Sequence, residues 1–136
     1  MKAYLMIFAV LYSSALFAED KTDMIVVNDK YCTSPKQTMD EIYENGALTH
    51  CVYQGMDLLA AYKKYVSEHD EAYLEKTLKR NVNNQKEYAD GSISVVYKWE
   101  NPRRLVIEQQ FSGGSTDFLL EEDKAGTKIT ITGYPD

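Results

Sequence analysis

Residues 93–111, ISVVYKWENPRRLVIEQQF, hold the pattern that decides the fold. Apolar side chains occupy every second position from Ile93 to Trp99, which is the spacing of a β-strand with one buried face. Asn101 and Pro102, which favour tight turns, separate this run from a second apolar run, RLVIEQQF. The stretch therefore predicts a β-hairpin.

Two more strands are predicted downstream of this hairpin. They are the apolar runs DFLL at 117–120 and KITITG at 128–133. Gly113 with Gly114, and then Gly126, lie between the runs, where hairpin turns require them. Four strands joined by tight turns pair in sequence order, so the second half of the chain predicts an antiparallel meander.

The residues before the hairpins have the spacing of helices instead. Ser34 and Gln37 fit a capping box around Pro35, so a helix is predicted to start there and to stop at Asn45 and Gly46.

A longer helix is predicted from Leu48 to Val66, because apolar residues recur every three or four positions. Gly55 lies inside this stripe, and we expect another element to approach the backbone closely there. Three shorter segments are interpreted as a further helix, a polar linker and a strand or extended arm: residues 70–81, 81–85 and 24–28, respectively.

Helices in the first half and strands in the second predict an α+β fold, with N-terminal helices packed on a C-terminal four-stranded antiparallel meander. The length suits a single small domain, which we expect to span residues 19–136.

Residues 1–18, MKAYLMIFAVLYSSALFA, have the layout of a secretory signal peptide, with Lys2, an apolar stretch and the small residue Ala18. The apolar stretch is shorter than the roughly 20 residues of a spanning helix and contains Ser13 and Ser14, so no membrane anchor is expected after cleavage. No Asn-x-Ser/Thr site occurs, which favours a bacterial envelope. We expect the protein to be periplasmic, or secreted.

The chain is acidic, with 21 Asp and Glu, 15 Lys and Arg and a formal net charge of −6. Removal of the leader takes away Lys2 and makes the charge one unit more negative. An acidic surface repels the phosphates of nucleic acids and of anionic membranes. We therefore expect no nucleic-acid partner, and a basic or neutral exported protein as the partner.

Cys32 and Cys51 are the only two cysteines of the chain. In a small exported domain, two cysteines are most simply interpreted as one disulfide, which would stabilise the fold by roughly 3 kcal/mol. The two Cα atoms must then lie within about 7 Å, so the chain must bend between them, near Gly46.

Three other roles for the cysteines stay open: a redox pair, a metal site and a catalytic thiol. No C-x-x-C motif is present, and the two cysteines with His50 and His69 match no usual zinc spacing. His50 precedes Cys51, but neighbouring residues on a helix point about 100 degrees apart, so they do not face each other. We expect no metal and no cofactor.

Nine of the eleven tyrosines follow the leader, and they suggest a binding surface. Tyr53, Tyr65 and Tyr73, if exposed, would form a recognition patch, because tyrosine offers a large contact area with few rotatable bonds. The alternative is that most tyrosines lie at the margin of the core, with the hydroxyl in water.

The sequence contains no G-x-S-x-G, H-E-x-x-H or phosphate-binding glycine loop after a strand, and its acidic runs fit solvated turns. We therefore expect a non-enzymatic binding protein, such as an inhibitor or immunity-type protein that acts on another envelope protein. The alternative is a periplasmic carrier of a small apolar ligand. A hydrolase is a third, less favoured reading. A carrier would hold its ligand between helices and sheet, in a cavity lined by these residues: Val52, Met56, Leu59, Tyr97 and Trp99.

Overall fold

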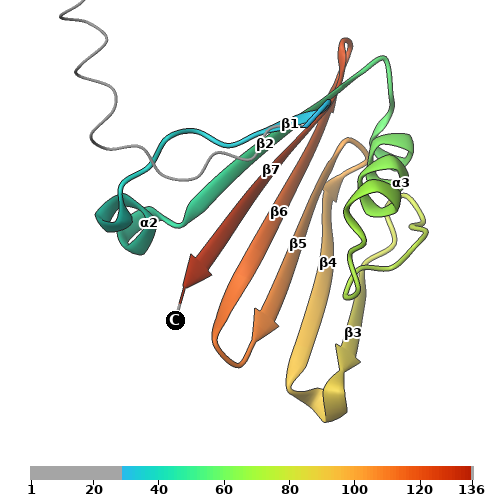
Figure 1. Ribbon diagram of the computed structural model, residues 1–136. Coiled ribbons are helices and arrows are strands. Elements are labelled where there is room, and N and C mark those ends of the chain that lie inside the picture. The colour runs from blue at the N-terminus through green and yellow to red at the C-terminus, as the bar shows by residue number, and fades with distance from the viewer. Residues whose placement is uncertain (1–28, 136) are drawn as a thin grey trace, which may run out of the picture.

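The computed structural model describes residues 29–135 (Figure 1). The predicted signal peptide at 1–18 and the predicted strand or arm at 24–28 lie outside the described residues. The elements follow one another as β1 (Cys32–Thr33), α2 (Met39–Asn45), β2 (Ala47–Gln54), α3 (Leu58–His69), β3 (Asn84–Tyr88), the 3-10 turn η1 (Ala89–Gly91), β4 (Ile93–Asn101), β5 (Arg104–Phe111), β6 (Gly114–Asp123) and β7 (Gly126–Pro135). Among these elements, neither helix has the length and apolar character needed to cross a membrane.

The strands form one seven-stranded antiparallel sheet in the order β1-β2-β7-β6-β5-β4-β3. The prediction of a four-stranded meander with N-terminal helices packed on it is therefore wrong, because residues 29–135 form mostly sheet, with two short helices. The four strands predicted from the sequence are β4 to β7, and each pairs with the next along the chain. Three more strands extend the sheet at both edges.

Residues 47–54, predicted as the start of a long helix, form β2. This strand pairs with β7 along its whole length, from Ala47 opposite Gly133 to Gln54 opposite Gly126. The side chains of β2 point alternately to the two faces of the sheet, so Cys51 is fully buried, whereas Val52 is 50% exposed. A strand forms here because every residue of this segment pairs in register with a residue of β7.

Gly55 ends β2 rather than lying inside a helix. The turn between β6 and β7 approaches its backbone, since the N–H of Gly55 donates to the carbonyl of Ala125 at 2.8 Å. An added Cβ would meet no atom within 4 Å, so the φ of +74°, and not this approach, accounts for the glycine. The helix starts later, at Leu58, where the side chain of Asp57 accepts a hydrogen bond from the N–H of Ala60.

Residues 70–81, predicted as a helix, form turns and irregular backbone instead. Side chains from the core satisfy this backbone: Tyr62 donates to the carbonyl of Glu75, and Tyr97 accepts from the N–H of Glu75. Leu74, which belongs to this segment, is buried in the core. The predicted linker at 81–85 ends within β3, which begins at Asn84.

Helix α2 starts four residues later than the predicted capping box. Thr38 is the N-cap, and its side chain and that of Glu41 form the box. The amide of Gln37, predicted to close a box with Ser34, is buried and bonds to the carbonyl of Gly46 and the N–H of Leu48. It therefore fixes the segment before α2 to the start of β2.

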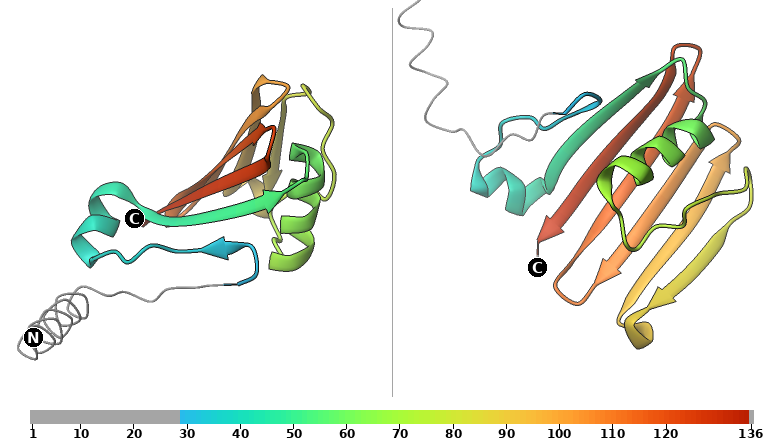
Figure 2. Two further views of the ribbon diagram at one scale, coloured as in Figure 1. Left: turned by 90° about the horizontal axis from the view of Figure 1, so that it is seen from above. Right: turned by 45° about the vertical axis from the view of Figure 1, so that its right-hand side comes forward.

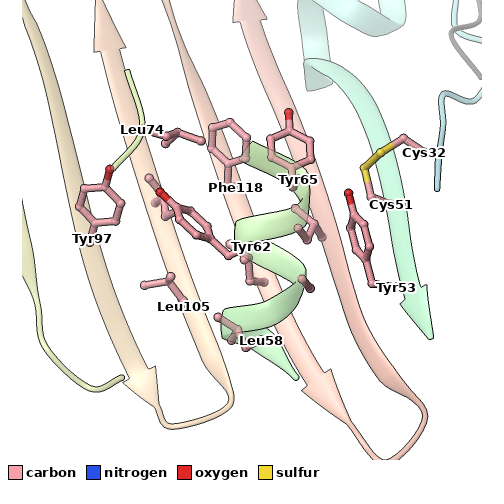
Figure 3. Close-up of a cluster of buried hydrophobic side chains, with 14 of the residues drawn as sticks. Cys32, Cys51, Tyr53, Leu58, Tyr62, Tyr65, Leu74, Tyr97, Leu105 and Phe118 are labelled. Carbon is pink, nitrogen blue, oxygen red and sulfur yellow. A yellow bond between two sulfur atoms is a disulfide. The ribbon is translucent and has the colours of Figure 1, made fainter. Parts of the chain in front are cut away.

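The core lies between α3 and one face of the sheet (Figure 3). Leu58, Tyr62 and Tyr65 of α3 point toward the sheet and are buried. The sheet contributes the inward positions of its strands: Cys51, Tyr53, Val95, Tyr97, Leu105, Ile107, Phe118, Leu120 and Ile129. A single helix thus covers a single face.

The predicted disulfide between Cys32 and Cys51 is confirmed. The two residues lie directly opposite each other on β1 and β2, with Cα atoms 4.0 Å apart, and both are buried. The bridge pins a two-residue edge strand to the sheet. The bend between the cysteines is the turn through α2 and Gly46.

Reduction of this disulfide should lower the free energy of unfolding by roughly 3 kcal/mol, because the unfolded chain regains the freedom of the closed loop. Urea unfolding of the oxidised protein and of a Cys32→Ser, Cys51→Ser double variant measures the difference. Equal stability of the two forms would contradict a stabilising bridge.

Gly126 should tolerate no side chain, because a Cβ there would lie 2.3 Å from the carbonyl oxygen of Tyr53 and 2.9 Å from the Cα of Gln54. We expect Gly126→Ala to cost about 1–3 kcal/mol or more by thermal or urea unfolding. Gly113→Ala is the matched control, since nothing lies within 4 Å of an added Cβ, and it should change stability by less than about 0.5 kcal/mol. Similar losses in both variants would refute the proposed clash.

Candidate functional site

The three tyrosines predicted as a recognition patch belong to the core. Tyr53 is fully buried on the inward side of β2, and Tyr65 is 5% exposed on the inward side of α3. Tyr73 is half-buried and packs edge-on against Tyr88 and Phe111. The exposure expected for Tyr53 and Tyr65 is therefore wrong, because strand and helix geometry turn both rings inward.

The cavity expected for a small apolar ligand is not formed by the residues named for it. Val52 and Tyr97 lie on opposite faces of the sheet, since Tyr97 is 1% exposed in the core and Val52 is 50% exposed. Those five residues therefore do not line one cavity.

His50 and Cys51 do not form a reactive pair. On β2 the two side chains point to opposite faces, and the sulfur of Cys51 is bonded to Cys32.

Asp29, Cys32 and His69 form one cluster of metal-ligand types among residues 29–135. His69 Nε2 lies 3.0 Å from a carboxylate oxygen of Asp29 and 3.8 Å from the sulfur of Cys32. That sulfur is in the disulfide and offers no thiolate, so two ligands remain, fewer than a zinc site needs.

The cluster instead ties the start of the described chain to the end of α3. Asp29 accepts hydrogen bonds from the N–H groups of Cys32 and Tyr31, and these bonds, together with His69, hold the pKa of its carboxyl below the usual value. The role that fits is structural.

A hollow of about 450 Å³ opens at the end of the sheet where β6 begins and β7 ends. α2 forms one side of it, and α3 does not reach this end of the sheet (Figure 2). The lining is uncharged and open to solvent: Ile42, Ala47, Phe111, Gly113, Gly114, Ser115, Thr116, Gly133, Tyr134 and Pro135.

Exposed apolar side chains lie on the two elements, α2 and the end of β7, that border this hollow. Among the described residues, five large apolar side chains are strongly exposed, and three of them belong to α2 or to the end of β7. They are Tyr43 at 64%, Met39 at 49% and Tyr134 at 42% exposed. We call the hollow and these three residues the α2 corner.

The charge of the α2 corner has one sign along the helix. α2 carries Asp40, Glu41 and Glu44 and no basic residue. Glu41 is used in the capping box, which holds its pKa below the usual value through the hydrogen bond from Thr38. The side chains of Asp40 and Glu44 make no hydrogen bond or ion pair with the described residues.

The backbone explains why α2 stands out from the sheet. Gly46 ends the helix with φ +88°, and an added Cβ would lie 2.5 Å from Cγ2 of Thr132. The helix buries none of its seven residues, so its apolar side chains stay available for contacts.

Sequence reasoning missed the α2 corner although its signal is present. The segment MDEIYEN combines three acids with three large apolar residues and no base, in a helix of seven residues. A helix of seven residues can turn only one side toward the rest of the protein, so apolar residues on its other sides face solvent.

No family model matches the chain, and neither the curated proteins nor the solved structures include a significant match. The functional interpretation therefore rests on the geometry of the molecule.

The buried tyrosines predict a loss of stability at alkaline pH. Burial raises the pKa values of Tyr53, Tyr62, Tyr65 and Tyr97 above the usual value of about 10. The folded state holds these protons more tightly, so the stabilisation is complete below about pH 10 and declines above it. We expect about 1.4 kcal/mol of loss per pH unit for each tyrosine that stays protonated only in the folded state.

Urea unfolding between pH 8 and pH 12 measures this decline. Tyr62→Phe is the comparison variant, because it should remove one proton from the slope above about pH 10. A free energy of unfolding that stays constant through pH 11 would contradict the burial of these hydroxyls.

Proposed function

We propose that the protein is an exported, non-enzymatic binding protein that takes a basic segment of another exported protein at the α2 corner. The observation that carries the proposal is the coincidence of exposed apolar side chains with an acid-only helix. Met39, Tyr43 and Tyr134 offer contact area, while Asp40 and Glu44 favour a partner that presents Lys or Arg.

Exposed aromatic and methionine side chains suit a protein interface. Tyrosine and methionine are enriched in the buried centre of such interfaces, with charged residues at the rim. Tyr43 can enter a pocket of the partner, and the hollow beside it can accept a side chain in return. An inhibitor or immunity-type protein works in this way, by occupying the surface that its target needs.

A periplasmic carrier of a small apolar ligand is the second candidate. The uncharged lining of the hollow favours it. Sites for small molecules enclose most of the ligand surface, however, and this hollow is open to solvent. The geometry therefore supports a macromolecular partner better than an enclosed small molecule.

The disulfide supports an address outside the cytosol. Structural disulfides persist in oxidising compartments, and both sulfur-bearing residues are buried here, away from thiol reductants. A periplasmic or secreted location agrees with the leader expected at residues 1–18.

A photoreactive amino acid in place of Tyr43 should crosslink the protein to one exported protein with a basic surface. The same amino acid in place of Val82, which is 52% exposed outside the α2 corner, is the matched control and should give no such product. The crosslinked species are separated by mass and identified in envelope fractions of the producing cells.

Charge reversal tests the electrostatic part. Asp40→Lys with Glu44→Lys should abolish the crosslink from position 43, whereas raised salt should weaken it in the unaltered chain. Equal products from positions 43 and 82 would refute the α2 corner as the binding surface. A copurifying apolar molecule in native mass spectrometry, with no crosslinked protein, would favour the carrier.

A further inference from the structure

Among residues 29–135, no helix lies over the second face of the sheet, since α3 lies on the other one (Figure 2). We call this the open face and define it by the outward positions of the five long strands, which alternate with the core residues, apart from Ser115 and Tyr134 of the α2 corner. Its centre is aliphatic, with Val106 directly opposite Leu119 on β5 and β6. Val96 lies on β4 next to this centre, whereas Leu48 and Val52 lie on β2, beyond the outward Thr130 of β7.

The open face is large enough for a stable interface. The five strands contain 8 to 10 residues each. With about 4.8 Å between strands and about 3.4 Å per residue, they span a face of roughly 650 Å². Standard interfaces bury about 800 Å² per partner, with a range of roughly 600 to 1,000 Å². The open face therefore falls within the range of specific complexes.

Charge distinguishes the open face from the rest of the molecule. It carries three bases and five acids, whereas the whole chain has a net charge of −6. They are Lys98, Arg104 and Lys128 with Glu100, Glu108, Asp117, Glu121 and Asp123. A face that carries both signs can pair its charges with those of a second copy, whereas two acid-only α2 helices would repel each other.

Asp117 and Lys128 of the open face make no ion pair within the described part of the chain. Glu108 pairs with Lys98 at 2.9 Å, and Arg104 pairs with Glu100 and Glu121. Asp117 lies on the central strand β6, opposite Glu108 of β5. Its side chain makes no hydrogen bond or ion pair with the described residues. Burial and the nearby Glu108 raise its pKa, so an added cation would stabilise its charged form.

We propose that the open face is the interface of a homodimer, in which two copies pack sheet against sheet. A lysine or arginine of the second copy supplies the cation that Asp117 lacks, and the aliphatic centres around Leu119 pack together. Sheets stacked in this way lie about 10 Å apart with interleaved side chains. Both α2 corners stay free, so the dimer presents two copies of that surface.

Sedimentation equilibrium of the disulfide-bonded protein, from about 1 μM to about 1 mM, tests the proposal. We expect the mass to rise from one to two chains with concentration. Leu119→Lys should weaken dimerisation at least tenfold, because it places a charge in the aliphatic centre. Lys98→Glu should also weaken it, and its exposed side chain leaves the fold unchanged, which circular dichroism confirms.

Two control variants separate the open face from other surfaces. Val82→Lys and Tyr43→Lys each add a charge at an exposed position outside the open face, and both should dimerise like the unaltered chain. The proposal is overturned if the protein stays a monomer up to about 1 mM. It is also overturned if neither Leu119→Lys nor Lys98→Glu weakens the dimer, or if Tyr43→Lys dissociates it equally.

Discussion

The pairing of β2 with β7 is the constraint on which the rest of the structure depends. It joins a segment near the start of the described chain to its last strand, over eight residue pairs. The pairing extends the sheet beyond β7. The chain must then cross one face of the sheet, through α3, to pass from β2 to β3 at the opposite edge. The connection between the two edges therefore places α3 over the core, and the apolar side of α3 faces the sheet.

The features at the β2 edge also follow from this pairing. Once β2 is fixed, Cys51 faces inward and lies opposite Cys32, so the disulfide and β1 close the edge. Because β2 begins at Ala47, the residues before it must leave the sheet, and α2 stands outside it as a short helix with no buried residue. The α2 corner and the open face thus lie on different parts of the same sheet. One has an acid-only helix beside apolar side chains, and the other carries charges of both signs.

The sequence supports the prediction of β4 to β7 because local turn chemistry at Asn101, Gly113 and Gly126 agrees with the period-2 alternation of the strands. It also supports the disulfide, which depends on compartment and cysteine number more than on local structure. Residues 47–54 satisfy helical spacing through Leu48 and Val52, and the distant partner β7 decides against it. The segment MDEIYEN signals the acidic and apolar character of the α2 corner, but the exposure of Tyr43 depends on where β2 begins, which the distant strand β7 decides.

Backbone NMR of the disulfide-bonded protein tests the pairing of β2 with β7 most directly. We predict strand-type chemical shifts for residues 48–53, and interstrand contacts that link Cys51 to Ile129 and Tyr53 to Thr127. Slow exchange of the β2 amide protons should accompany them, because they are bonded inside the sheet. Helical shifts across 48–53, with contacts between residues three or four apart and none to β7, would contradict the account.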